Sequence, residues 1–251
     1  MPSVAFDFLG TLYSFDKVID RLHESFPSDL KTRDETSRFF YEWLWSGLRD
    51  YFGASSAGRY CPLLQVLKAT LARAMRIRKY SIPSADEIDR IIATFADLDP
   101  APTAREALQL LKKNGWDLWI ATNGGYQSTQ ALLESKDLLD YFRLDGQKDT
   151  LNILSCDDLR ISKPHPKVYS EVMRLAVHRT QRIENFYFVS SHAWDLAGAK
   201  NVSFRTVFLT TEEGEYAKDM YNGVGPDIQG DSILECVEKL MELEKTKKYF
   251  L

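Results

Sequence analysis

The pattern of apolar and polar positions divides the chain into two kinds of segment. Residues 4–8 form a short apolar run stopped by Gly10, which predicts a buried strand followed by a turn. From about residue 16 to residue 97 the apolar positions recur at helical spacing instead. This part predicts four helices, over residues 16–26, 35–52, 63–78 and 84–95. Ser84 and Glu87 form the capping-box pattern at the start of the fourth helix.

After Pro100 and Pro102, strand-like and helix-like segments alternate along the chain. Strands are predicted over residues 116–121, 153–155, 186–190 and 206–209. Helices are predicted over residues 103–113, 127–139, 166–177, 194–200 and 232–245. Strands that alternate with helices form a parallel sheet. We therefore expect an α/β core made of residues 1–15 and 98–251, with an all-helical insertion, residues 16–97, after the first strand.

Composition is that of an ordinary globular protein. The chain has 251 residues, of which 44% are hydrophobic and 27% charged, and its formal net charge is −4. A nucleic-acid partner needs a basic stripe, so the slightly acidic balance argues against one. No apolar run approaches the roughly 20 residues that span a bilayer, so no membrane segment is expected.

The first residues and the cysteines favour a cytoplasmic location. The amino terminus has no cationic region and reaches an acid at Asp7, unlike a signal peptide. Cys61, Cys156 and Cys236 are widely spaced, so neither a disulfide framework nor a zinc site is indicated. We expect reduced thiols, as in a cytosolic protein.

Polar residues gather where the predicted strands end. In an open parallel sheet, ligands bind at the carboxyl ends of the strands. The residues expected there are Asp7, Thr11, Thr122, Asn123, Lys163, Ser190, Ser191, His192 and Asp195. Each of them also fits a helix cap, but their conjunction indicates a site.

An acid that closes a buried apolar strand is the sharpest of these signals. Asp7 would be buried, so its charge needs a partner, and Lys163 can supply one. Such a partner lowers the pKa of a carboxyl by roughly 1–3 units. Asp7 would then stay ionised and act as a nucleophile, although a purely structural ion pair fits the same pattern.

Four motifs resemble those of the haloacid dehalogenase superfamily. They are Phe-Asp-Phe-Leu-Gly-Thr-Leu, Ala-Thr-Asn-Gly, Ser-Lys-Pro-His-Pro and Phe-Val-Ser-Ser-His-Ala-Trp-Asp-Leu-Ala-Gly-Ala, in that order. The form Ser-Ser-x-Ala-Trp-Asp-x-x-Gly-Ala is similar to that of the (S)-2-haloacid dehalogenases. The resemblance implies a Rossmann-like core with an inserted helical cap, which agrees with the pattern above.

The resemblance also implies roles around the first strand. Asp7 would be the nucleophile, and Thr11 and Ser190 would hold its carboxylate by hydrogen bonds. Lys163 would fix and neutralise Asp7. Asp195 would orient or activate the water that cleaves the ester.

Further residues are implied to line the substrate site. Thr122 and Asn123 would bind the substrate carboxylate or the leaving halide. Tyr169 matches a tyrosine that lies near the site in the family. Trp194 would line the substrate pocket, although a tryptophan at such a place also fits core packing.

Two positions separate this chain from the magnesium-dependent phosphatases of the superfamily. Those enzymes carry an acid two residues after the nucleophile, where this chain has Leu9, and another where it has Ser191. A halide needs no proton to leave, so the missing acid is no loss to a dehalogenase. We therefore expect no metal or other cofactor, with Leu9 lining the substrate pocket.

Three positions depart from the dehalogenase pattern. The family carries tyrosine where this chain has Leu9, and asparagine where it has His192. His192 would replace the amide hydrogen bond, act as a base that titrates near neutrality, or point away and cap the helix that follows it. Arg38 is the nearest candidate for the cap arginine that grips the halide, while another alignment leaves Glu35 there.

The sequence thus predicts a hydrolase that removes halide from a short 2-haloacid through an ester on Asp7. Two alternatives stay open: a phosphatase with degenerate motifs, and a binding protein without activity that retains the fold. The expected partner is a small-molecule substrate, with a homodimer as a possible assembly.

Overall fold

The computed structural model describes residues 2–144, 147–181, 183 and 185–247. Its core is a six-stranded sheet in the order β5-β2-β1-β6-β7-β8, with every neighbouring pair parallel. In that order the strands are Ile153–Ser155, Asp117–Thr122, Ser3–Phe6, Phe186–Ser190, Arg205–Leu209 and Ile228–Gly230. The chain order reverses at β1, so the ends of β1, β2 and β6 meet at a topological switch point.

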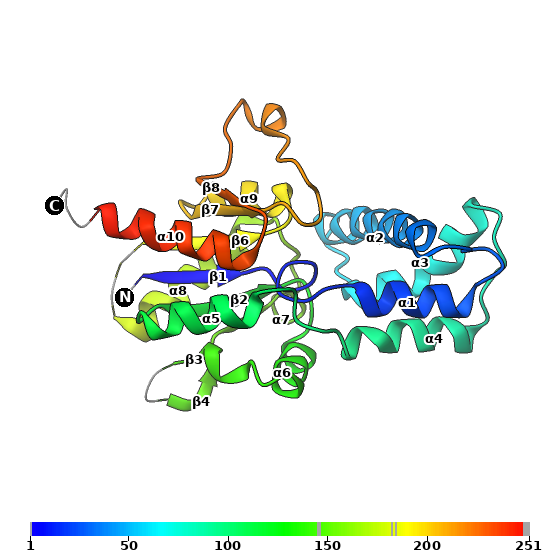
Figure 1. Ribbon diagram of the computed structural model, residues 1–251, viewed down its shortest axis with the longest axis horizontal. Helices are drawn as coiled ribbons and strands as arrows, with labels where there is room; N and C mark the ends of the chain where they lie inside the picture. Colours follow the sequence, from blue (N-terminus) through cyan, green and yellow to red (C-terminus); the bar gives the residue numbers. More distant parts are fainter. Residues whose placement is uncertain (1, 145–146, 182, 184, 248–251) are drawn as a thin grey trace.

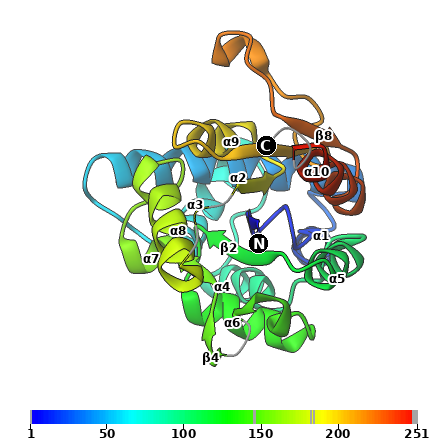
Figure 2. The ribbon, with the colours of Figure 1, turned by 90° about the vertical axis from the view of Figure 1, so that its left-hand side faces the viewer.

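Helices cover both faces of the sheet, as Figure 2 shows in a view along the strands. On one side lie α5 and α10, which are Ala104–Lys113 and Ile233–Lys247, and on the other lie α8 and α9, which are Pro166–Thr180 and Ala193–Lys200. Residues of β1 alternate between two apolar clusters. Val4 and Phe6 join the cluster of α5 and α10, and Ala5 joins that of α8 and α9. This alternation is the period of a strand buried on both faces.

Four helices form a second body beyond the carboxyl ends of the strands, on the right of Figure 1. They are α1 (Asp16–Ser25), α2 (Arg33–Ser56), α3 (Leu63–Ile77) and α4 (Ala85–Ala93), followed by the short η1 (Thr94–Ala96). Capping boxes begin α2 at Thr32 and α4 at Ser84, where Glu87 completes the predicted pair. The α/β class with an inserted helical part is thus confirmed.

The remaining elements lie outside these layers, with β3, β4 and α6 at the bottom of Figure 1 and η3 in the loop at its top. They are α6 (Tyr126–Ser135), η2 (Leu139–Phe142), the antiparallel pair β3 (Arg143–Leu144) and β4 (Gln147–Leu151), α7 (Cys156–Leu159) and η3 (Lys218–Tyr221). The helix predicted over 127–139 was too long. It ends at Ser135 because Asp137 takes a positive φ of 54° that no α-helix continues through.

The strands β3, β4 and β8 were not predicted, because none of them carries the apolar run that marks β1, β5, β6 and β7. Between β7 and β8 the chain makes a long excursion away from the core, at the top of Figures 1 and 2. This excursion starts at the end of β7 that faces the helical body. Across the described residues, no helix is both long enough and apolar enough to cross a membrane.

Candidate active site

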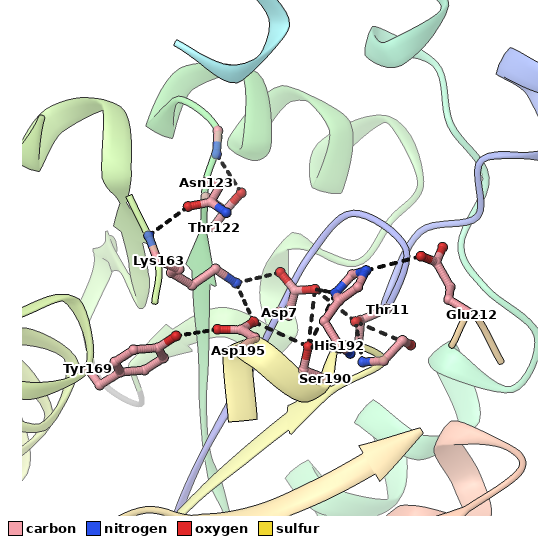
Figure 3. A network of polar contacts seen from close by, with 12 residues as sticks. Asp7, Thr11, Thr122, Asn123, Lys163, Tyr169, Ser190, His192, Asp195 and Glu212 are labelled. Atoms are coloured by element: carbon pink, nitrogen blue, oxygen red, sulfur yellow. Dashed lines mark hydrogen bonds and ion pairs between the residues drawn. The ribbon is translucent and has the colours of Figure 1, made fainter. Parts of the chain in front are cut away.

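Three buried charged side chains meet at the end of β1. Asp7 follows β1 directly, Lys163 lies in the loop before α8, and Asp195 lies in the first turn of α9. Nζ of Lys163 lies 2.6 Å from Oδ1 of Asp7 and 2.7 Å from Oδ2 of Asp195 (Figure 3). The side chains of Lys163 and Asp195 are fully buried, and that of Asp7 is 8% exposed. One ammonium therefore serves two carboxylates.

The two oxygens of Asp7 have different surroundings. Oδ1 accepts from Lys163 alone among the described residues. Oδ2 faces two donors, Oγ1 of Thr11 at 2.9 Å and Nδ1 of His192 at 3.1 Å, and Oγ of Ser190 lies 3.5 Å away (Figure 3). A carboxylate oxygen has about two lone pairs, so Oδ2 is saturated while Oδ1 keeps one lone pair free.

These contacts set the charges of the three groups. Burial opposes the charge of Asp7, but Lys163 and then His192 hold the pKa of its carboxyl well below the usual range. Burial also opposes the charge of Lys163, yet Asp195 and Asp7 raise its pKa. Burial raises the pKa of Asp195 against the effect of Lys163. Asp7 is therefore an ionised carboxylate, and Asp195 is the more basic of the two.

Tyr169 and Ser190 fix the orientation of Asp195. The hydroxyl of Tyr169 donates to Oδ1 of Asp195 at 2.5 Å, and Oγ of Ser190 lies 3.2 Å from Oδ2. Burial and then the charge of Asp195 raise the pKa of Tyr169 well above its usual value, so this phenol stays a donor. Tyr169 therefore acts on the site through its hydrogen bond to Asp195.

His192 points into the site between two carboxylates. Its Nδ1 lies 3.1 Å from Oδ2 of Asp7, and its Nε2 lies 3.0 Å from Oε2 of Glu212. Burial opposes a charged ring, but Asp7 and Glu212 raise the pKa of His192 well above its usual value. Its side chain makes no cap hydrogen bond to α9, so the alternative that it points away and caps that helix is wrong.

A cavity of about 30 Å³ lies between the helical body and the sheet. Its apolar wall comes from residues outside the strands, namely Phe15, Leu44, Leu48, Leu63, Leu67 and Phe95. On the side of the sheet it is lined by Asp7, Leu9, Thr122, Asn123, His192 and Trp194. A water molecule needs about 10–15 Å³, so the cavity has room for about two or three groups of that size.

Asn123 and Thr122 present hydrogen-bond donors to the cavity. Oδ1 of Asn123 accepts from the backbone N–H of Lys163 at 3.0 Å, which leaves its NH₂ group without a partner within the described residues. Oγ1 of Thr122 accepts from the backbone N–H of Gly124 at 2.9 Å, which leaves its proton free to be donated. The ring of Trp194 stacks on His192 at 5.3 Å and packs edge-on against Phe52.

Arg38 does not reach the site. Its side chain is 68% exposed and pairs with Asp34 on the surface of α2. Arg38 lies six positions before Leu44, roughly 120° around the helix from the face that lines the cavity. Glu35 is no alternative, because it completes the capping box of α2. The prediction that Arg38 lines the substrate pocket is therefore wrong.

The sequence reasoning missed Glu212 and Tyr51. Glu212 lies three residues after β7, so the rule that directed attention to the other strand ends applies to it as well. Tyr51 reads as an ordinary apolar position of a helix, and only the fold shows its hydroxyl against Asn123. Within the described part of the chain, no three His, Cys, Asp or Glu side chains are grouped to hold a metal ion.

Comparison with known proteins identifies the family of this chain. Residues 1–203 match the family model described as a haloacid dehalogenase-like hydrolase. The chain belongs to this family. It is 27% identical over 242 residues to an (S)-2-haloacid dehalogenase of Pseudomonas sp. strain YL, which covers 95% of this chain and 94% of the relative. It is 38% identical to (S)-2-haloacid dehalogenase 4A of Burkholderia cepacia, over 49% of each chain.

Solved structures show the same architecture. One described as a dehalogenase superposes with a TM-score of 0.75 at 26% identity, covering 94% of this chain and 95% of that one. The L-2-haloacid dehalogenase of Xanthobacter autotrophicus, in a structure with chloropropionic acid covalently bound, gives a TM-score of 0.74 at 22% identity. That match covers 95% of this chain and 98% of the other. At 22% identity the likeness establishes the fold.

Proposed function

We propose that the protein hydrolyses the carbon–halogen bond of a short 2-haloacid through an ester on Asp7. The observation that carries this proposal is the asymmetry of Asp7, which has one saturated oxygen and one oxygen with a free lone pair. The names of the relatives, (S)-2-haloacid dehalogenases, support the same reaction. The cavity beside Asp7 is small and largely apolar, which favours a short substrate over a long one.

In the first step, Oδ1 of Asp7 attacks carbon 2 of the haloacid. A carbon–oxygen bond forms, the carbon–halogen bond breaks, and the halide leaves with the electron pair. Lys163 holds Oδ1 in place and keeps Asp7 ionised. The free donors of Thr122 and Asn123 are suited to the substrate carboxylate, because each can give it a hydrogen bond.

In the second step, water attacks Cγ of Asp7 and gives one proton to Asp195, whose raised pKa suits a base. The carbonyl electrons move to Oδ2, where Thr11 and His192 donate hydrogen bonds. When this oxyanion collapses, the 2-hydroxy acid leaves and takes the proton back from Asp195. The new carboxyl of Asp7 then releases its own proton to solvent.

Leu9 and Ser191 weigh against the phosphatase alternative. Leu9 contributes an apolar side chain to the cavity, so no acid stands there to protonate a leaving alcohol. Oγ of Ser191 lies 3.2 Å from Oγ1 of Thr211 and carries no charge. The inactive alternative is also weaker, because a buried Asp–Lys–Asp cluster is costly to keep without use.

The proposal also covers the domains, the location and the assembly of the protein. Residues 1–15 and 98–251 would form the catalytic core, and residues 16–97 the cap. The cytoplasm is the proposed location, and Cys61, Cys156 and Cys236 are all free thiols. A homodimer remains part of the proposal.

One experiment tests the reaction directly. Single-turnover hydrolysis of 2-chloropropionate in ¹⁸O-water should label Asp7 before it labels the product, and mass spectrometry of the peptide that contains Asp7 reports this. Activity should persist after chelation of divalent metals. Label that appears first in lactate, or a chelator-sensitive release of phosphate from phosphate esters in place of halide release, would show that the proposal is wrong.

A further inference from the structure

Glu212 is buried beside the site although the reaction above gives it no role. Its side chain is 7% exposed, and Oε2 lies 3.0 Å from Nε2 of His192 (Figure 3). Gly10, with a φ of +80°, leaves the room for this carboxylate. A Cβ at Gly10 would lie 2.5 Å from Oε1 of Glu212. Any larger residue at position 10 would thus collide with Glu212, so the glycine in the turn after β1 leaves space for this side chain from the segment after β7.

The ring of His192 has a carboxylate at each nitrogen. A neutral imidazole has one donor and one acceptor nitrogen, whereas both nitrogens here face acceptors, so the imidazolium form fits the geometry. Trp194 stacks on the ring and excludes water from that side. Two carboxylates and one aromatic plane therefore define the position and charge of His192.

Other titratable groups surround this pair from several elements. Lys163 contacts Asp7, and Asp195 shares Ser190 with His192. On the far side of Glu212 stands Tyr41 of α2, whose pKa is raised by burial and then by the charge of Glu212. Glu213 accepts from the backbone N–H of Ala193 at 2.9 Å and contributes a like charge. None of these groups replaces Glu212 at Nε2 among the described residues.

The reaction changes the balance of charge around His192. When Asp7 becomes an ester it is neutral, and Nδ1 then faces a carbonyl oxygen. Of the two carboxylates in contact with the ring, Glu212 is the one that the reaction leaves unmodified. The next event, attack by water, places negative charge on Oδ2 of Asp7. A donor that is still protonated is needed there at that moment.

We propose that Glu212 is a positioning residue that keeps His192 protonated in the ester intermediate, so that Nδ1–H donates to Oδ2 as this oxygen becomes an oxyanion. The inference rests on the proposed function and adds a residue to it. Donors that face a developing oxyanion typically contribute on the order of 10²–10³-fold to the rate. A base at His192 would require the opposite state, a neutral ring with a free lone pair on Nδ1.

Single-turnover kinetics of Glu212→Gln tests the proposal. The amide keeps the shape and an acceptor for Nε2–H but removes the charge. Halide release should stay within a few-fold of wild type, while hydrolysis of the Asp7 ester at pH 8 slows on the order of 10²-fold and the ester accumulates. Lowering the pH should restore hydrolysis, because the ring then takes up a proton again. Glu213→Gln is the matched control and should leave both steps unchanged.

Two kinetic results would overturn the proposal. One is ester hydrolysis in Glu212→Gln with the rate and pH dependence of wild type. The other is a loss of hydrolysis on the acid side of the profile, which would make His192 a base. Glu212→Asp keeps the charge but retracts it by one methylene. Ester hydrolysis in this variant should be slower than in wild type and faster than in Glu212→Gln, which distinguishes the effect of the position of the carboxylate from the effect of its charge. Wild type that releases no halide from any 2-haloacid would instead refute the proposed function.

A second measurement needs no turnover. The chain has four histidines, so NMR of their ring resonances is simple, and His192→Asn assigns the signal. Asp7→Asn mimics the uncharged ester. In Asp7→Asn, His192 should remain protonated at pH 7, and adding Glu212→Gln should lower its pKa by about 1–3 units. Equal pKa values in the single and double variants would overturn the role of Glu212.

Discussion

The hydroxyl of Tyr51 lies 3.2 Å from the backbone carbonyl oxygen of Asn123 and joins helix α2 to the loop that lines the cavity. It also lies 2.9 Å from the hydroxyl of Tyr60, which donates to Oδ1 of Asp157 at 2.6 Å. Burial raises the pKa of both tyrosines above the usual range, so both stay protonated. The placement of Asn123 therefore depends on the helical body as well as on β2.

Tyr51→Phe should loosen Asn123. We expect a loss of about 1 kcal/mol of unfolding free energy, the typical contribution of one hydrogen bond, and a rise in KM with a smaller change in kcat. Urea denaturation and initial rates of halide release measure the two effects. Tyr80→Phe is the control, because no partner of the Tyr80 hydroxyl lies among the described residues. An equal rise in KM in both variants would remove Tyr51 from this role.

Lys163→Met should be far more damaging. It leaves Asp7 and Asp195 buried without the ammonium between them, and breaking a buried pair costs about 3–5 kcal/mol. Halide release should be lost as well. Adding Asp195→Asn should recover part of the stability, since one uncompensated charge is then removed. A single variant within about 1 kcal/mol of wild type in urea would contradict this reasoning.

Acid should weaken the protein through Asp7. The pKa of Asp7 is depressed in the folded chain, so its contribution to stability is present above about pH 3.9, the pKa of an unfolded aspartate, and is lost as pH falls toward the folded value. Wild type should be more stable than Asp7→Asn at pH 5, and the difference should shrink by pH 2. Thermal unfolding of both proteins across this range measures it. If the stability difference between wild type and Asp7→Asn grew as the pH falls, the ionised Asp7 would not stabilise the fold.

Leu48→Ala should widen the range of substrates. Leu48 is nearly buried and lines the cavity, so its truncation adds space next to Asp7. Longer acids, such as 2-bromohexanoate, should gain kcat/KM relative to chloroacetate, at a cost of about 2–5 kcal/mol in stability. Leu22→Ala, a buried change elsewhere in the helical body, should cost similar stability without altering the preference. The same shift in both variants would point to general loosening.

The fold was predictable where an element is long enough for its apolar positions to show a regular period. Buried strands such as Asp117–Thr122 and the amphipathic helices of residues 16–97 carry enough positions to show a period. The end of α6 was not predictable, because the positive φ of Asp137 reflects the local turn and not a Gly or Pro signal. Strand β8 is only Ile228–Gly230, and pairing with β7 is what makes it a strand.

The site was predictable where residues follow strands in recognisable motifs. Asp7, Lys163 and Asp195 meet as expected, and Asn123 lines the cavity beside them. The prediction for Arg38 was wrong because a sequence does not show which face of a long helix turns toward a distant sheet edge. Glu212 was missed because it lies outside the motifs, 20 residues from the histidine that it contacts.

The order of strands has a consequence for folding. β1 lies between β2 and β6, and the contact between Asp7 and Lys163 joins residues 156 positions apart. Ser190, which contacts both Asp7 and Asp195, comes later still in the chain. Contacts of such separation form late, after long loops have closed. A nascent chain that ends before β6 therefore leaves one edge of β1 unpaired. Asp7 then lacks the contact with Ser190, and Lys163 lacks the contact with Asp195. The sheet centre and the buried charge cluster can form only after residue 195 has been synthesised.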